Sequence, residues 1–133
     1  MAETIAFELV APEKLIISAN VEMVVIPGVE GNLGVLPGHA PLIANVRPGV
    51  VDVQEAGVIK EQIFVAGGFC EITPTQCTLL APEAIKLSEI DKAVAEQRQI
   101  NAREAEAKAD SKTLKKAQIE CRIADAILDA ISK

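Results

Sequence analysis

A run of glycine and proline residues between positions 27 and 42 constrains this chain more than any other segment. It reads PGVEGNLGVLPGHAPL, with leucine and valine between the glycines and prolines. Glycine permits backbone angles that other residues resist, and proline fixes φ and removes a hydrogen-bond donor. The run therefore predicts a shaped loop between short strands. No lysine or arginine occurs from Leu15 to Val46, so the loop lacks a cation for phosphate, and this indicates a protein-binding surface.

Short strand patterns surround this loop. Residues 4–10 alternate in polarity, with Ile5, Phe7 and Leu9 on one side. Residues 15–26 predict one strand, with odd-numbered positions such as Ile17 and Val25 on one side. Further strands are predicted at 32–36, 42–46, 50–55, 58–65, 69–73 and 76–81. Many short strands separated by Gly/Pro turns indicate an all-β sandwich or barrel.

The pattern changes after Pro82. Ser88, three residues before Asp91, resembles a capping box and predicts a helix from there to about residue 109. Asp110 and Ser111 predict a turn and the next N-cap. The second helix has an apolar stripe at helical spacing, widened by Ile119, Ile123, Ile127 and Ala130: Leu114, Ala117, Cys121, Ala124, Leu128 and Ile131. Two helices with a short connection predict an antiparallel hairpin.

The first helix offers only a weak apolar stripe. Ile90, Val94 and Ile100 are its large apolar residues, and most of the others are alanine. Weak anchoring is typical of elements that move. We expect a sandwich domain over residues 1–84 and a mobile helical hairpin over 85–133.

Charge supports this division and excludes several function classes. Nine acidic and three basic residues lie before residue 83, and ten of each follow. The net charge of −6 and the three aromatic residues argue against nucleic-acid binding. Three cysteines and one histidine without ligand spacing argue against zinc and indicate buried, reduced thiols. We expect no signal peptide at Met1 and, without an apolar run of ~20 residues, membrane association only through a partner.

The motifs of enzymes are missing from the loop. His39 has no nucleophile or acid near it in residues 31–46, so a structural hydrogen bond is the simpler interpretation; a pH switch stays open. The spacing of Gly31, Gly34 and Gly38 does not match a dinucleotide-binding motif, and no Lys-Ser/Thr follows as in a P-loop. We therefore expect no catalytic residue, no metal and no cofactor.

Three segments in order resemble one protein family. The segments are GNLGVLPGHAPL at 31–42, RPG at 47–49 and AGGFCEI at 66–72, and the alanine-rich charged tail follows them. In this order they resemble the epsilon subunit of bacterial rotary ATP synthases, which is called the delta subunit in mitochondria. The resemblance implies an α+β fold with an N-terminal sandwich and a C-terminal hairpin. It implies a non-catalytic central-stalk subunit of a proton-translocating ATP synthase that couples c-ring rotation to ATP synthesis. The hairpin would restrain ATP hydrolysis.

The resemblance also implies contact residues. The rotor ring would be touched by Glu30, Gly31, Asn32, His39, Ala40, Pro41 and Leu42. Some relatives carry an acid at the position of Asn32, and Glu30 would partly replace it. On the tail, the residues facing the alpha and beta subunits of the catalytic head would be Arg98, Arg103, Lys108, Lys115, Lys116 and Arg122, beside Glu96. The alternative for these tail charges is a solvated face.

An ATP-binding motif found in some bacterial relatives is incomplete in this chain. Ile90, Asp91 and Ala95 match it, but Val94 stands where those relatives have arginine. A missing cation removes a principal phosphate partner, so we expect weak or absent ATP binding.

The resemblance implies three groups of partners: the gamma subunit, the c-ring, and the alpha and beta subunits through the tail. It places the chain peripherally on the cytoplasmic face of the bacterial inner membrane. The alternative is a free-standing β-sandwich module with a helical tail that binds another protein. Co-purification with gamma in a membrane-bound assembly would distinguish the two.

Overall fold

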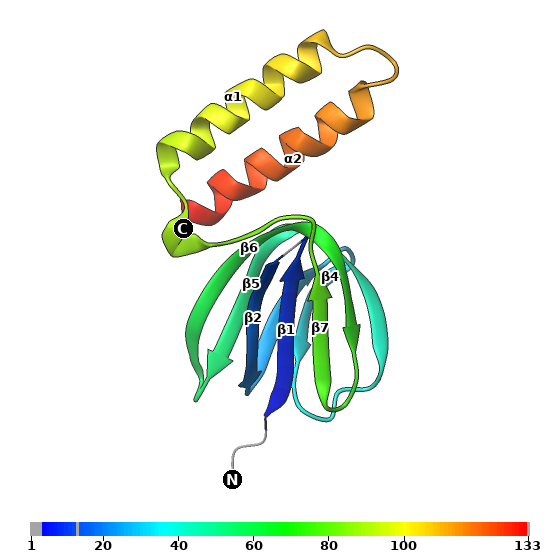
Figure 1. Cartoon of the computed structure of the whole chain (residues 1–133), viewed down its shortest axis with the longest axis vertical. Helices are drawn as coiled ribbons and strands as arrows, with labels where there is room; N and C mark the ends of the chain where they lie inside the picture. The colour runs from blue at the N-terminus through cyan, green and yellow to red at the C-terminus, as the bar shows by residue number, and fades with distance from the viewer. Residues whose placement is uncertain (1–3, 13, 133) are drawn as a thin grey trace. The chain divides into compact units, whose positions relative to one another are not determined.

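The computed structural model describes residues 4–12 and 14–132 and contains the predicted sandwich and helical hairpin (Figure 1). The predicted α+β fold class is confirmed. The strands are β1 (Ile5–Ala11), β2 (Lys14–Val21), β3 (Met23–Gly28), β4 (Gly31–Val35), β5 (Leu42–Glu55), β6 (Val58–Ile72), β7 (Gln76–Leu80) and β8 (Ala84–Lys86). A 3₁₀ turn, η1 (Leu87–Glu89), precedes the helices α1 (Lys92–Lys108) and α2 (Leu114–Ile131). The chain divides into two compact units, one up to Lys86 and one from Leu87 onward.

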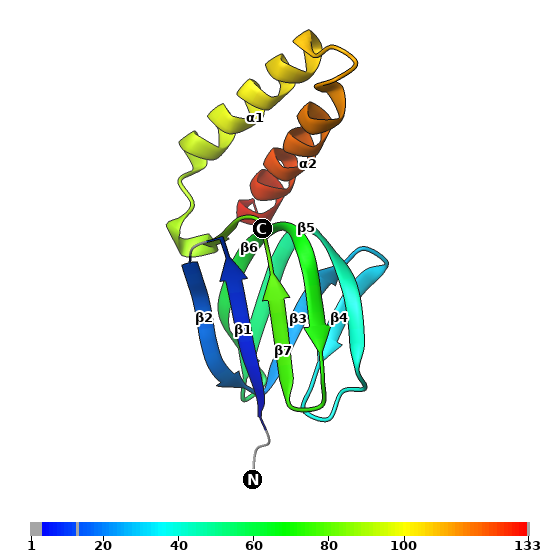
Figure 2. The ribbon, with the colours of Figure 1, turned by 45° about the vertical axis from the view of Figure 1, so that its right-hand side comes forward.

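The two longest strands build both layers of the sandwich. The strand order is β2-β1-β7-β6-β5-β3-β4 (Figure 2). The short β8 also pairs with β6. The first part of β5 pairs with the last part of β6, which lies beside β7. The second part of β5 pairs with the first part of β6, between β3 and β8. Each long strand thus contributes to both layers, and their inner faces enclose the core.

This continuity differs from the expected pairs of shorter strands. The segments at 42–46 and 50–55 are one strand, and so are those at 58–65 and 69–73. The residues expected to separate these shorter strands lie within the β5–β6 ladder, where Pro48 pairs with Ala66 and Val46 with Gly68. Gly67 and Gly68 have positive φ, which lets β6 turn the corner without ending. At Gly68 a Cβ atom would lie 2.0 Å from the Leu80 carbonyl oxygen, so only glycine fits there.

The single strand expected over 15–26 is wrong. The structure divides it at Glu22 into β2 and β3. Ile17 and Val21 are buried before the break, and Val24 and Ile26 after it, so the inward positions change parity. A Glu22 carboxylate oxygen accepts a hydrogen bond of 2.6 Å from the backbone N–H of Ala56 in the β5–β6 turn. The break between β2 and β3 therefore places the Glu22 carboxylate where it binds the backbone of the β5–β6 turn.

The sandwich core is hydrophobic and contains two thiols. Ile5, Phe7 and Leu9 are fully buried, as the alternation predicted. Cys70 and Cys77 are buried and free, whereas Cys121 is half-buried. Burial raises the pKa of the Cys77 thiol to about 12, and the Cys70 thiol adds to the shift.

The start of α1 differs from the expectation. The N-cap is Asp91, whose carboxylate accepts a hydrogen bond from the Ala93 N–H at 2.9 Å. Ser88 lies one turn earlier, in η1, and does not cap the helix. In the turn between the helices, the Asp110 carboxylate accepts bonds from the N–H groups of Lys112 and Thr113, and the N-cap of α2 is Thr113. The predicted role of Asp110 in the turn is confirmed, but Ser111 is not the cap.

The hairpin buries small side chains on α1. Ala95 and Ala102 are its buried residues, whereas Val94 and Ile100 are 65% and 50% exposed, so the predicted apolar stripe is wrong for α1. On α2 the buried residues are Ala117, Ile123, Ala124, Ile127 and Ala130. Leu114, at the start of the predicted α2 stripe, is exposed. None of the described helices is both long enough and apolar enough to cross a membrane.

Candidate partner-binding site

The tip of the β3–β4 hairpin depends on two glycines. Gly28 and Gly31 pair across a turn formed by Val29 and Glu30. A Cβ atom on Gly28 would lie 2.6 Å from the Gly31 carbonyl oxygen, and Gly31 has a φ of +136°. Such close approach and such a φ both favour glycine. The glycines therefore make a narrow tip that presents Glu30 and Asn32 to solvent.

The tip and the start of β5 line one groove. Its lining runs over residues 28–33 and 42–45 and encloses about 480 Å³. The Val29 N–H donates to the Asn45 carbonyl at 3.0 Å, which ties the tip to β5. Val29 and Ile43 are 62% and 67% exposed although both are apolar. This tip groove therefore offers exposed apolar side chains beside polar backbone and amide groups.

Arg47 holds the tip from the next part of β5. Its Nη1 donates to the Gly28 carbonyl at 2.5 Å, and its Nη2 donates to the Asn32 Oδ1 at 2.7 Å. The loop sequence holds no cation, and no local pattern connected Arg47 to the tip. Arg47 is the only lysine or arginine between Lys14 and Lys60. This isolation is the sequence feature that could have marked it as a functional residue.

The predicted ring-contact residues divide into two groups. Glu30, Gly31, Asn32 and Leu42 line the tip groove, but residues 39–41 do not. The loop that holds residues 39–41 is bound elsewhere, because the Gly38 N–H donates to the Pro74 carbonyl at 2.8 Å. His39 Nδ1 lies 2.7 Å from the Ala40 carbonyl, to which its N–H form donates. This local bond fits the structural interpretation of the histidine.

A second exposed apolar feature crosses the outer face of the sandwich. Phe69 on β6 pairs with Leu80 on β7, Leu80 with Val10 on β1, and Val10 with Leu15 on β2. Phe69, Leu80 and Leu15 are exposed, and Val10 is half-buried. Cross-strand neighbours lie close enough for their side chains to touch. We name these four residues the apolar row.

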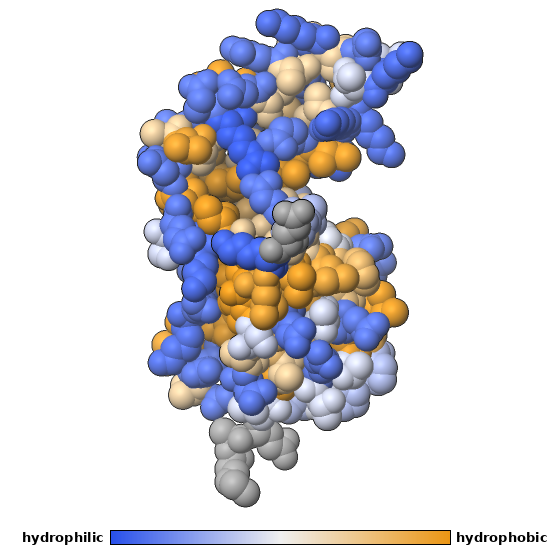
Figure 3. Space-filling view, viewed as in Figure 1, coloured by the Kyte–Doolittle hydropathy of each residue, from blue (hydrophilic) through white to orange (hydrophobic). Residues whose placement is uncertain are grey.

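Of the six basic residues predicted to contact the catalytic head, two form ion pairs across the hairpin and four are exposed. Arg98 Nε lies 2.6 Å from Glu120 Oε1, and Arg103 Nη2 lies 3.4 Å from Asp125 Oδ1, so both arginines pair across the hairpin. Lys108, Lys115, Lys116 and Arg122 are exposed. Hydrophilic residues cover much of the hairpin face seen in Figure 3. Four of the six predicted head-contact residues therefore point their charge to solvent in this structure.

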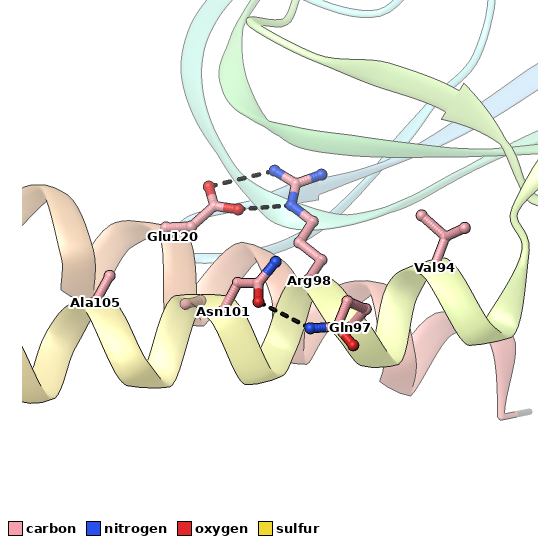
Figure 4. A pocket seen from close by; sticks show the side chains of 7 residues that line it. Val94, Gln97, Arg98, Asn101, Ala105 and Glu120 are labelled. Carbon is pink, nitrogen blue, oxygen red and sulfur yellow. Dashed lines mark hydrogen bonds and ion pairs between the residues drawn. The ribbon is translucent and has the colours of Figure 1, made fainter.

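The degenerate ATP motif borders a hollow on the hairpin. Val94, Arg98 and Asn101 line it, with Gln97, Ala102, Ala105 and Glu120. Figure 4 shows Arg98 directed at Glu120 and a bond of 2.9 Å from Gln97 to Asn101. Asp91 is engaged as the N-cap of α1. Among the described lining residues Arg98 is the only cation, and its charge is already compensated by Glu120.

A metal site would need several ligands close together. In the part of the chain that the structure describes, no three His, Cys, Asp or Glu side chains gather in this way. The tip groove and the apolar row instead present exposed apolar side chains, which suit contact with another protein.

Comparisons with known proteins agree on one family. Residues 4–87 match the family model of the ATP synthase delta/epsilon chain, β-sandwich domain. The chain is 50% identical over 112 residues to the ATP synthase epsilon chain of Paramagnetospirillum magneticum, over 83% of this chain and 84% of the relative. It is similar to a chain in the Euglena gracilis mitochondrial ATP synthase structure (OSCP/F1/c-ring), with a TM-score of 0.79, 25% identity, and 93% and 79% of the two chains covered. A chain in the Tetrahymena thermophila mitochondrial ATP synthase structure (central stalk/c-ring) shares the fold, with a TM-score of 0.68, 12% identity, and 98% and 97% covered.

Proposed function

The chain belongs to the ATP synthase delta/epsilon family, and from this premise we propose that its sandwich binds the gamma subunit and rests on the c-ring through the tip groove. The family predicted from the loop motifs is confirmed. The chain is a non-catalytic stalk subunit of a rotary ATP synthase. Its task in the complex is then mechanical, because it must transmit rotation between partners.

The tip groove is the observation that carries the ring contact. Its two apolar flanks are exposed, and its tip is fixed by Arg47 and by the bond from Val29 to Asn45. A fixed tip loses little conformational freedom on binding, which favours affinity. In this proposal Glu30, Gly31, Asn32 and Leu42 touch the ring directly, while residues 39–41 flank that contact.

The apolar row supports the contact with gamma. It crosses four adjacent strands and exposes Phe69, Leu80 and Leu15 on one face. Exposed apolar surface of this kind marks protein-binding faces. A sheet is also a suitable surface for receiving torque, because hydrogen bonds join each of these four strands to the next.

The hairpin is the proposed regulatory part. We assign the exposed Lys108, Lys115, Lys116 and Arg122 to contacts with the alpha and beta subunits, where the hairpin restrains ATP hydrolysis. In this proposal Arg98 and Arg103 join those contacts only after leaving their partners on α2. The complex holds the chain peripherally at the cytoplasmic face of the bacterial inner membrane.

A substitution at the tip tests the ring contact. Gly31→Trp adds a large side chain to a residue that lines the groove, at a position where a Cβ meets no atom within 4 Å, so it alters the surface that would meet the ring. Gly57→Trp is the matched control, because Gly57 also has a positive φ and open space but lies in the β5–β6 turn. We expect Gly31→Trp, and not the control, to lower ATP-driven proton pumping per ATP hydrolysed in the reassembled enzyme. Equal pumping by both variants would refute the placement.

A further inference from the structure

The charge of Arg47 is not compensated by the chain itself. Its two bonds go to neutral acceptors, the Gly28 carbonyl and the Asn32 amide oxygen. Arg47 makes no ion pair with any carboxylate of the described residues, although the tip carries Glu30 nearby in sequence. An exposed guanidinium is thus held in place with its full positive charge.

The guanidinium retains binding capacity in this position. Arginine has five N–H donors in a planar fork, and two bonds to the tip leave the others directed elsewhere. A fork of this shape matches the two oxygens of a carboxylate. Because Gly28 and Asn32 already fix the side chain, little rotamer freedom remains to be lost when an anion binds.

On the basis of the proposed ring contact, we propose that Arg47 receives a carboxylate from a polar loop of the rotor ring. Val29 and Ile43 then cover the apolar part of that loop beside the carboxylate. Asn32 holds the arginine without neutralising it, and this makes position 32 a determinant of specificity.

Two features favour a protein carboxylate over a lipid phosphate. Surfaces that bind anionic lipid gather several lysines or arginines, whereas no other cation occurs from residue 15 to 59. Residues 1–82 carry nine acids against three bases, so an anionic bilayer repels this part of the chain. A single arginine held by Gly28 and Asn32, which line the tip groove, suits one carboxylate on a protein.

Asn32→Asp is the decisive variant. Aspartate has nearly the same shape as asparagine, accepts the same bond from Nη2 and neutralises Arg47 from within. A role of Arg47 limited to holding the tip would survive this change, whereas a role as carboxylate receptor would be lost. Arg47→Gln removes the charge, and Asn20→Asp is the matched control with the same charge change on exposed β2.

The measurement is the affinity of the F1 complex carrying each variant for purified c-ring in neutral-lipid nanodiscs, at several salt concentrations. We expect Asn32→Asp and Arg47→Gln each to weaken binding by about tenfold and to reduce its salt dependence. Asn20→Asp should bind like the unaltered protein. Urea unfolding of each chain shows that the fold is retained, and Asn32→Asp decides the question if Arg47→Gln fails to fold.

Different results would overturn the carboxylate inference and the ring contact. Unchanged affinity of Asn32→Asp, while Gly31→Trp weakens binding, would overturn the carboxylate inference and leave the ring contact standing. Unchanged affinity of both would refute the ring contact itself. Arg47-dependent binding of the complex to protein-free anionic vesicles would identify a lipid phosphate instead and would also overturn the inference.

Discussion

Gly68 shows how a single residue determines the path of a long strand. Its φ is +126°, and a Cβ atom at this position would lie 2.0 Å from the Leu80 carbonyl oxygen, so there is no space for a side chain. Gly68→Ala should therefore destabilise the sandwich by about 3 kcal/mol or more, through backbone strain and overpacking. Gly57→Ala, with positive φ but open space, should cost only about 1 kcal/mol. Urea unfolding measures both, and equal losses would contradict the steric explanation.

The buried Cys77 thiol links stability to pH. Its pKa is about 12 in the folded chain against an ordinary value of 9.0. The folded state keeps the proton where the unfolded state loses it, so stability is intact below pH 9 and falls as the pH rises toward 12. The slope approaches about 1.4 kcal/mol per pH unit. Cys77→Ala should flatten this fall in urea unfolding series, whereas Cys121→Ala, at a half-buried site, should change it less; an unchanged slope in Cys77→Ala would contradict this assignment.

Functional residues could be predicted where their contacts are close in the sequence, and were missed where their contacts are distant in the sequence. Gly31 and Asn32 were recognised because a local run of glycines and prolines defines the tip. Arg47 was missed because its bonds join positions 15 and 19 residues apart, which no local pattern contains. Residues 39–41 were predicted as ring contacts from the family resemblance, and they do not line the tip groove.

At the scale of elements, β8 determines where the sandwich can be cut. Its residues pair with Ile63, Phe64 and Val65 on β6, and the Lys86 Nζ lies 3.1 Å from Glu61. A chain ending at Lys86 should unfold cooperatively with a strand-type circular dichroism spectrum. A chain ending at Pro82 exposes that edge of β6 and should have a lower melting temperature. A Lys86 chain that does not fold would show that the helices complete the core.

Element boundaries were predicted less well than element types. Strand and helix periods are local, so the sandwich and the hairpin could be predicted. The sequence did not predict that two shorter strands join to form β5 and that two others join to form β6. Pro48 and Gly68 usually end strands unless a neighbouring strand pairs with them, as it does here. The buried face of α1 was missed for a similar reason, since Ala95 and Ala102 carry little hydrophobic signal and Val94 dominates the pattern although it faces solvent.

At the scale of the whole molecule, the hairpin can be removed without touching the two surfaces proposed for gamma and the ring. Both surfaces lie before residue 83. Deleting residues 89–133 should therefore leave assembly intact and raise ATP hydrolysis, if the hairpin restrains it. The assay compares hydrolysis by enzyme reassembled with the full or the shortened chain. Equal rates with equal assembly would remove the regulatory role.

Control of the hairpin by ATP would need a cation on the hairpin that is free to bind phosphate. A ligand shifts a conformational equilibrium only by its difference in affinity for the two states. The hollow beside Val94 offers a triphosphate only Arg98 among its described lining residues, and Arg98 is paired with Glu120 at 2.6 Å. Titrating ATP into the isolated chain should therefore give no saturable heat up to low-millimolar concentration.

Val94→Arg should restore binding, because it places an unpaired cation on the exposed side of the same hollow, one helical turn from Arg98. Val94→Gln has comparable polarity without the charge and should remain silent in the same titration. Submillimolar binding by the unaltered chain would contradict this prediction and would make ATP a candidate for biasing the hairpin. Absence of binding together with a gain in Val94→Arg would instead leave contacts with gamma and the catalytic head as the controlling interactions, since the chain then has no affinity difference for ATP to exploit.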